Sequence, residues 1–320
     1  MLTVSWNDAF DKIHAPGARL PSKGDARLTP LGAFPILTPR FELRPGQRVF
    51  TIGSCFARHI EKRLTGFDLP TRRFAAPSEE WPYAPNGLLG EFNPGTMAQR
   101  ILTALEKRDF GDNGLVDLPS GATVDLLLRS GAAPVSRTRA VERRAEIDAI
   151  YAELPTSDAT IITLGLVEAW FDRATGLYLN QMPPISALRS EPDRYELRAL
   201  DEVDCFALLE GALGALIESG MRRIVVTVSP VPMNTTFSGR DCMIANSASK
   251  AALRSCADRL CRRWPEVDYF PSFEIVMSGG AASFEDDHVH VRDEVVSAVV
   301  RHLLDAYVPE SKITSRISRE

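Results

Sequence analysis

The chain has 320 residues, 44% of them hydrophobic and 25% charged, which is enough to bury a substantial core in one large domain or two smaller ones. The formal net charge of -5 argues against a nucleic-acid partner, which normally requires a basic patch. We find neither a signal-peptide pattern nor a run of about 18 apolar residues, so we expect a cytoplasmic protein without a membrane span. The five cysteines contain no C-x-x-C pair, which favours reduced thiols over a disulfide framework or a metal site.

Strands and helices are predicted to alternate along the chain. Strand-like apolar runs cover 48–53, 159–165, 222–230 and 267–276, and helical periodicity covers about 96–108, 138–153, 202–219, 243–263 and 292–307. The runs are nearly continuous in Val and Ile, which is typical of parallel strands that are covered on both faces. The pattern therefore predicts a three-layer α/β fold.

The distribution of Pro and Gly suggests how the chain is organised. Residues 1–45 are rich in both and precede the first clear strand, so we expect an extension that packs on the body. The main domain is predicted to cover 46–310, followed by a C-terminal tail at 311–320. Two further Pro- and Gly-rich segments, 72–95 and 168–200, are predicted to be irregular, and such segments often shape a site.

The stretch VFTIGSCFARHI, residues 49–60, places two small nucleophilic side chains where a strand is predicted to turn into a helix. Ligands of open parallel sheets bind beyond the carboxyl ends of the strands, so Ser54 and Cys55 are candidate catalytic residues. The positive end of a helix dipole also stabilises a thiolate. A second interpretation stays open, in which Ser54 caps the helix and Cys55 is a packing residue.

A D-x-x-H pattern lies in FEDDHVHVRDEVV, just before the last predicted helix. Asp287 there can accept the Nδ1 proton of His290, which fixes the tautomer and leaves Nε2 as a base for a nucleophile opposite. His288 and Asp286 lie beside this pair, but no other ligand cluster accompanies them, so no metal is predicted.

On these motifs the chain resembles the GSCFA family, whose defining residues are Gly53 to Ala57 here, and which is grouped with the SGNH (GDSL-like) hydrolases. The resemblance runs through NGLLGEFNPGT, ITLGLVEAW, TVSPVP, ANSASKAALR and YFPSFEIV to DDHVH, about residues 48–300. It implies a flavodoxin-like sheet in which the Gly-Asp-Ser turn carries the nucleophile. This turn falls on Gly53, Ser54 and Cys55, so the resemblance implies Cys55 as nucleophile, with His290 as base and Asp287 as the acid that orients it.

The resemblance departs from the SGNH pattern at one functional position. The Gly-x-Asn-Asp block falls on 165–168, where Val167 replaces the asparagine that donates to the oxyanion. We therefore expect the oxyanion donor elsewhere. Candidates around the site are the backbone of the turn at Gly53 and Cys55 and three residues of the NGLLG loop, Asn86, Gly87 and Gly90. The turn is also similar to that of capsular-polysaccharide acetyltransferases with Gly-Asn-Cys-Gln, where the acyl donor is coenzyme A.

Several other residues are weaker candidates. His59 follows Cys55 by four residues, one helical turn along the same face, and is a candidate contact for the thiol. Side chains that could line a pocket, with packing as the open alternative, are Glu168, Trp170, Asn180, Trp81, Tyr83 and Glu274.

Together these features predict a Cys- or Ser-dependent enzyme that hydrolyses an ester or transfers an acyl group through a covalent intermediate. The expected substrate is a small or carbohydrate-linked acyl compound, with acyl-coenzyme A as a candidate co-substrate and no bound cofactor. Two alternatives stay open: a catalytically silent module that binds a sugar or peptide in the same cleft, and a thiol redox sensor. The oligomeric state is not predicted.

Overall fold

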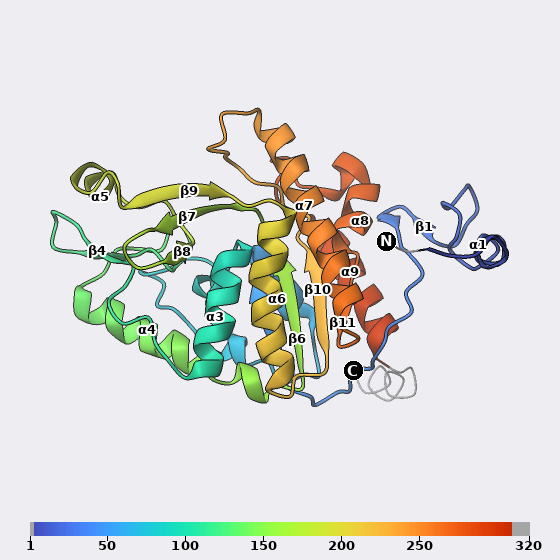
Figure 1. Ribbon diagram of the computed structural model, residues 1–320, viewed down its shortest axis with the longest axis horizontal. Helices are drawn as coiled ribbons and strands as arrows, with labels where there is room; N and C mark the ends of the chain where they lie inside the picture. Colours follow the sequence, from blue (N-terminus) through green and yellow to red (C-terminus); the bar gives the residue numbers. More distant parts are fainter. Residues whose placement is uncertain (1–2, 309–320) are drawn as a thin grey trace.

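A sheet of four parallel strands forms the centre of the computed structural model, which describes residues 3–308 (Figure 1). The strand order is β11-β10-β6-β3, with β3 at Val49–Gly53, β6 at Ala159–Leu164, β10 at Ile224–Val228 and β11 at Val267–Tyr269. Phe50 lies opposite Thr160 in this register, and Val226 lies opposite Ile162. Every residue of β3, β6 and β10 is buried, because both faces of the sheet are covered.

The helices cover the two faces of this sheet in two groups. Helices α3 (Pro94–Glu106), α6 (Glu202–Glu218) and α7 (Cys242–Arg263) pack with Phe50 and Ile162 in one core cluster. Helices α2 (Cys55–Arg63), α8 (Ser272–Ser278) and α9 (Asp293–Tyr307) pack with Val49 and Ile161 in a second one. Alternate side chains of each strand thus pack against the helices on opposite faces of the sheet. The prediction of a three-layer α/β fold is confirmed.

The predicted helices agree with the structure to within two residues at each end, including α4 (Arg137–Tyr151). The predicted strand over 267–276 is wrong in its second half, because β11 ends at Tyr269 and α8 begins at Ser272. Pro271 lies between them, and proline has no N–H with which to continue a ladder. Glu274 consequently lies on a helix.

The segment 168–200 is not irregular as expected, because it forms an antiparallel sheet of order β8-β7-β9. Its elements are β7 (Glu168–Asp172), β8 (Leu177–Leu179), α5 (Ile185–Ser190) and β9 (Tyr195–Ala199). A hairpin of β4 (Leu115–Asp117) and β5 (Thr123–Asp125) lies at the same end of the molecule (Figure 1). A separate apolar cluster around Leu126 and Leu179 joins these elements. Segment 72–95 is irregular as predicted, with short 3-10 turns as its only helical structure until α3 begins at Pro94.

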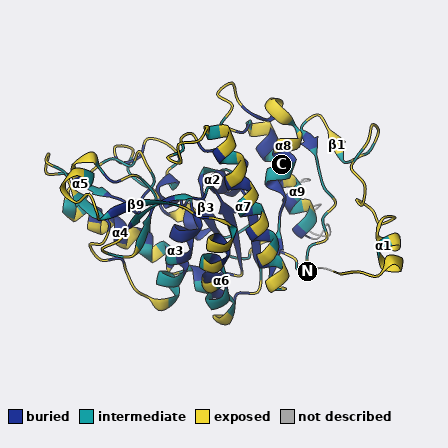
Figure 2. Cartoon of the chain, turned by 45° about the horizontal axis from the view of Figure 1, so that its top comes forward, coloured by how far each residue is buried: buried dark blue, intermediate teal, exposed yellow. Residues whose placement is uncertain are grey.

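The N-terminal segment packs on the body only in its later part. Helix α1 (Trp6–Lys12) buries no residue and projects away from the domain (Figures 1 and 2). A short hairpin follows, formed by β1 (Leu28–Thr29) and β2 (Gly32–Ala33), and beyond it Leu43 is fully buried in the α2–α9 layer. The predicted tail at 311–320 lies outside the described residues, and the domain boundaries at 45 and 310 stay predictions.

Candidate active site

A pocket of about 580 Å³ opens at the carboxyl ends of the central strands. Ser54 follows β3, Gly165 follows β6 and Ser229 follows β10, and all three line it. Because parallel strands end at the same edge, these residues meet although they lie far apart in the chain. Loops around Phe92, Arg129, Asn180, Asn234 and His290 complete the walls.

A tight strand-to-helix turn carries the two nucleophilic side chains. Gly53 has a φ of 144°, and a Cβ there would lie 2.5 Å from the carbonyl oxygen of Thr163, so the position requires glycine. Cys55 begins α2 and lines the pocket as a half-buried thiol. Ser54 occupies the cap position, but its side chain makes no capping hydrogen bond and instead donates to Ser229 Oγ at 3.4 Å. The interpretation of Ser54 as a side-chain cap is therefore wrong.

The D-x-x-H segment forms a closed loop that brings its acid and base together. The backbone N–H of Glu285 donates to the carbonyl of His290 at 2.8 Å, and His288 takes a left-handed φ of 55° at the bend. Asp287 Oδ1 accepts the backbone N–H groups of Val289 and His290, both at 2.9 Å. Asp287 Oδ2 lies 2.5 Å from His290 Nδ1. The two residues are three positions apart, so a local turn is enough to form the pair.

This geometry fixes the chemistry of the pair. The hydrogen bond from His290, followed by the two backbone N–H groups, holds the pKa of Asp287 well below its usual range, so the carboxylate stays ionised at neutral pH. An ionised Asp287 accepts a hydrogen bond from the N–H at Nδ1 of His290, so the proton stays on Nδ1 and Nε2 is left as a base. His290 lines the same pocket as Cys55, while His288 does not. The structure therefore places a thiol and an oriented imidazole around one cavity.

The structure does not bring Asn86 and Gly87 to the pocket. The Nδ2 group of Asn86 donates to Glu61 Oε2 at 2.6 Å and to the carbonyl of Thr71 at 3.1 Å. A Cβ on Gly87 would lie 2.3 Å from the indole nitrogen of Trp81, so glycine is needed there for packing. We had expected this loop to donate to an oxyanion. The structure instead gives Asn86 and Gly87 a structural role, because the Asn86 amide is bonded to groups outside the pocket.

Among the other predicted site residues, Gly53, Gly90 and His59 also lie outside the pocket lining. Burial, with the nearby Lys62 and Arg63 charges, lowers the pKa of His59 below its ordinary value, so this imidazole is neutral at pH 7. Its role as a thiol contact stays a prediction.

Glu168, Trp170 and Asn180 do line the pocket. Glu168 Oε1 accepts the hydroxyl of Thr236 at 2.5 Å and Oε2 accepts the N–H of Phe237 at 2.8 Å, so this carboxylate anchors the loop after β10. Three weaker candidates lie elsewhere: Trp81 is buried, Tyr83 is exposed, and Glu274 bonds Arg254 at 2.8 Å and Tyr269 at 2.7 Å.

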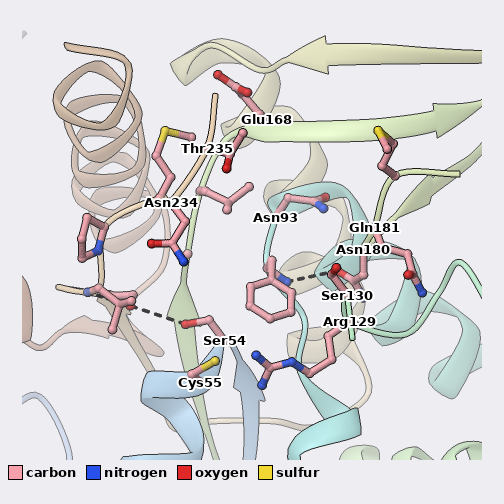
Figure 3. A pocket seen from close by; sticks show the side chains of 18 of the residues that line it. Ser54, Cys55, Asn93, Arg129, Ser130, Glu168, Asn180, Gln181, Asn234 and Thr235 are labelled. Atoms are coloured by element: carbon pink, nitrogen blue, oxygen red, sulfur yellow. Dashed lines mark hydrogen bonds between the residues drawn. The ribbon is translucent and has the colours of Figure 1, made fainter. Parts of the chain in front are cut away.

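Sequence reasoning missed three pocket features. Arg129 and Asn234 line the pocket from loops that carry no recognisable motif (Figure 3). Lys250 on α7 is buried behind the wall, where Nζ donates to the carbonyls of Gly165 at 2.6 Å and Val231 at 2.8 Å. The only sequence signal for Lys250 was its position among small and apolar residues of the helical ANSASKAALR stretch. This signal was weak, because lysine is rarely fully buried.

Two general features bear on the class of protein. Within residues 3–308, no group of three or more His, Cys, Asp or Glu side chains is arranged to hold a metal ion. None of the helices in that same range combines the length and the apolar character that crossing a bilayer demands.

Comparisons with known proteins complete the description. No curated protein matches the chain. Two similar solved structures are catalytic mutants of an acetylxylan esterase from Geobacillus stearothermophilus, at 14% and 15% identity. Each match covers 84% of this chain and 100% of the esterase chain, with a TM-score of 0.33. The model of the GSCFA family matches residues 48–303, and the protein belongs to the GSCFA family.

Proposed function

We propose that the protein is an esterase-like acyl enzyme in which Cys55 forms a thioester intermediate. One observation carries the proposal: Cys55, at the first position of α2, and His290, bonded through Nδ1 to Asp287, line the same pocket. Nucleophilic acyl transfer uses these three kinds of group, a nucleophile, a base and a group that orients the base, which supports the proposal.

The reaction divides into two halves. In the first, His290 Nε2 takes the thiol proton, the thiolate adds to the substrate carbonyl, and the leaving alcohol or thiol departs with that proton. In the second, His290 takes a proton from water or from an acceptor hydroxyl, which attacks the thioester and releases the acid or the new ester. The returning proton restores the thiol, so the same residues serve hydrolysis and transfer.

The developing oxyanion needs hydrogen-bond donors near Cys55. The backbone N–H of Cys55 belongs to the first turn of α2, where the Ser54 side chain provides no cap. The amide of Asn234 lines the pocket and points toward Ser54 (Figure 3). We assign these two groups as the oxyanion donors, in place of Asn86 and Gly87.

Intact-mass measurement tests this proposal directly. The protein is incubated with a panel of acyl-coenzyme A thioesters, p-nitrophenyl esters and acetylated sugars, which the family resemblance suggests as donor and substrate classes. We expect an acyl increment that is absent in Cys55→Ala. Cys242→Ala is the matched control, because Cys242 is also half-buried but lies outside the pocket lining. Failure to acylate and to turn over any member of the panel would favour the alternative of a catalytically silent binding module.

A further inference from the structure

Arg129 is an arginine without a carboxylate partner inside the proposed active-site pocket. Its guanidinium carbon lies 4.4 Å from the centre of the Trp81 ring and 5.4 Å from that of Phe92. No Asp or Glu among residues 3–308 lies within ion-pair distance of it, and its buried Nε has no hydrogen-bond partner in the same range. Burying a guanidinium nitrogen without a partner is costly, so a group that completes its hydrogen bonds would be bound favourably.

Three buried arginines differ from Arg129 in that each has a carboxylate partner. Arg100 pairs with Glu91 at 3.0 Å, Arg143 pairs with Glu80 at 3.0 Å, and Arg144 pairs with Asp125 at 2.6 Å. The fold therefore neutralises its structural arginines with its own carboxylates. Arg129 lines the cavity and is left uncompensated, which distinguishes a ligand-facing cation from a structural one.

The charged side chains of the pocket lining also point to an anionic ligand for Arg129. Arg129 is the single Lys or Arg side chain among the described residues of the lining, and Glu168 is the single carboxylate. Both oxygens of Glu168 are occupied by Thr236 and Phe237. These neutral donors leave Glu168 charged but hold it to the loop after β10, where it forms no ion pair with Arg129, so the Arg129 guanidinium stays available on the pocket wall as a cationic donor for an anionic ligand.

The position of Arg129 is set before any ligand arrives. Gln181 Nε2 donates to the carbonyls of Asp125 at 2.8 Å and Leu128 at 3.1 Å, and Asn180 Nδ2 donates to that of Leu127 at 2.9 Å. These bonds hold the backbone that leads into Arg129, and the aromatic rings hold its side chain. In Figure 3 the guanidinium extends from this wall toward Cys55. A guanidinium group that is already held in position lowers the entropy cost of binding an anion.

We propose that Arg129 selects substrates that carry a carboxylate beside the reacting carbonyl, a specificity that rests on the proposed acyl chemistry. A planar guanidinium matches a carboxylate through two parallel hydrogen bonds. A single cation balances a singly charged carboxylate, whereas a doubly charged phosphate would be left half-compensated. The substrate class is accordingly an ester or thioester of a dicarboxylic acid, or an ester whose alcohol part bears an acid group.

Ligand binding to Cys55→Ala tests this without requiring turnover. Calorimetry compares the monomethyl half-esters of malonic, succinic and glutaric acids with their neutral dimethyl esters. At least one half-ester should bind about 10- to 100-fold more tightly than its diester, the range expected for a charge-assisted pair. The preference should disappear when Arg129→Met is added, because methionine keeps an apolar stem against Trp81 and removes the charge.

Arg173→Met is the matched control, since Arg173 is an exposed arginine 3.9 Å from Glu196 and outside the pocket. It should retain the full preference for the half-ester. Should Arg129→Met lose its cooperative melting transition, Arg129→Gln carries the same comparison. Equal binding of half-esters and diesters, or a preference that survives the loss of Arg129, would overturn the proposal. Because binding is measured in the Cys55→Ala background, this result is independent of whether the acyl chemistry is correct.

A kinetic comparison separates selectivity from catalysis. With p-nitrophenyl esters, Arg129→Met should lower kcat/KM for the hemisuccinate about 10- to 100-fold and for the butyrate less than threefold. An equal loss of kcat for both esters would instead assign Arg129 to the oxyanion and overturn the proposed selectivity.

Discussion

Asn86 Nδ2 lies 2.6 Å from Glu61 Oε2, and this bond ties the loop after η1 (Pro70–Arg73) to helix α2. The other oxygen of Glu61 accepts the hydroxyl of Thr71 at 2.6 Å and lies 2.8 Å from Arg58 Nη1. Arg58 and Glu61 are both nearly inaccessible to solvent. A buried network of this kind depends on every member being bonded, so Asn86 supports the helix that carries Cys55.

Asn86→Ala should therefore lower the free energy of unfolding by about 1 to 3 kcal/mol, the cost of leaving a buried charged oxygen without a partner. The kcat should stay within about threefold of wild type. Urea unfolding and steady-state kinetics measure the two effects, with the exposed Asn113→Ala as control. A 100-fold loss of kcat at unchanged stability would return Asn86 to the oxyanion site.

Asn234→Ala should show the opposite pattern. Its amide faces the nucleophile turn and lies in an exposed loop, so removing it costs little stability. We expect kcat to fall about 100-fold with KM nearly unchanged, which is typical of a group that acts mainly in the transition state. An unchanged kcat in this variant would leave the backbone N–H groups of α2 as the sole donors.

His290→Ala should lower kcat by at least about 100-fold, because general-base catalysis contributes that much. The melting temperature should change little, since His290 is a largely exposed side chain. His288→Asn is the matched control: asparagine tolerates the left-handed backbone at that position, and residue 288 does not line the pocket. Activity of His290→Ala within a few-fold of wild type would refute its assignment as the base.

Cys55→Ser should keep the fold and lose most of the turnover, because the hydroxyl is a weaker nucleophile in a site arranged for a thiol. Ser54→Ala should retain much of the activity, since its hydroxyl contacts Ser229 at 3.4 Å. Initial rates and iodoacetamide inactivation of both variants distinguish the two side chains. A fully active Cys55→Ser combined with an inactive Ser54→Ala would identify serine as the nucleophile.

Lys250 predicts a pH dependence of stability. Burial lowers its pKa to about 7 from an ordinary value near 10.5. Between those two values the unfolded chain holds a proton that the folded chain does not, so the contribution of Lys250 to the unfolding free energy rises with pH. Lys250→Met should reduce the slope of that free energy by up to about 1.4 kcal/mol per pH unit between pH 7.5 and 9.5.

Urea unfolding at several pH values measures this slope in both proteins. At the high-pH end of this range Lys250→Met should be the less stable protein, because the carbonyls of Gly165 and Val231 lose their shared donor. Toward pH 7 the variant should gain on the wild type, because it no longer bears the cost of burying a group that is protonated in the unfolded chain. If the unfolding free energies of wild type and variant changed with pH in parallel, Lys250 would not be the group that loses its proton on folding.

The fold was largely predictable because its strands and helices are marked by local patterns. Continuous Val and Ile runs specify buried parallel strands, and the helical periods of α3, α6, α7 and α9 specify the layers that cover them. The antiparallel sheet at 168–200 could not be predicted in the same way. Its strands are short, and their buried and half-exposed residues do not alternate regularly. They are stabilised by pairs distant in sequence, such as Asp172 with Arg194.

The sequence by itself determined the nucleophile turn and the Asp287–His290 pair, because both depend on residues within one turn of each other. Only the tertiary structure decided which distant side chains meet the nucleophile. It bonds Asn86 to Glu61, away from the pocket, and brings Arg129 and Asn234 into the pocket from loops with no motif. Such long-range placement follows from the packing of whole elements, and no spacing along the chain records it.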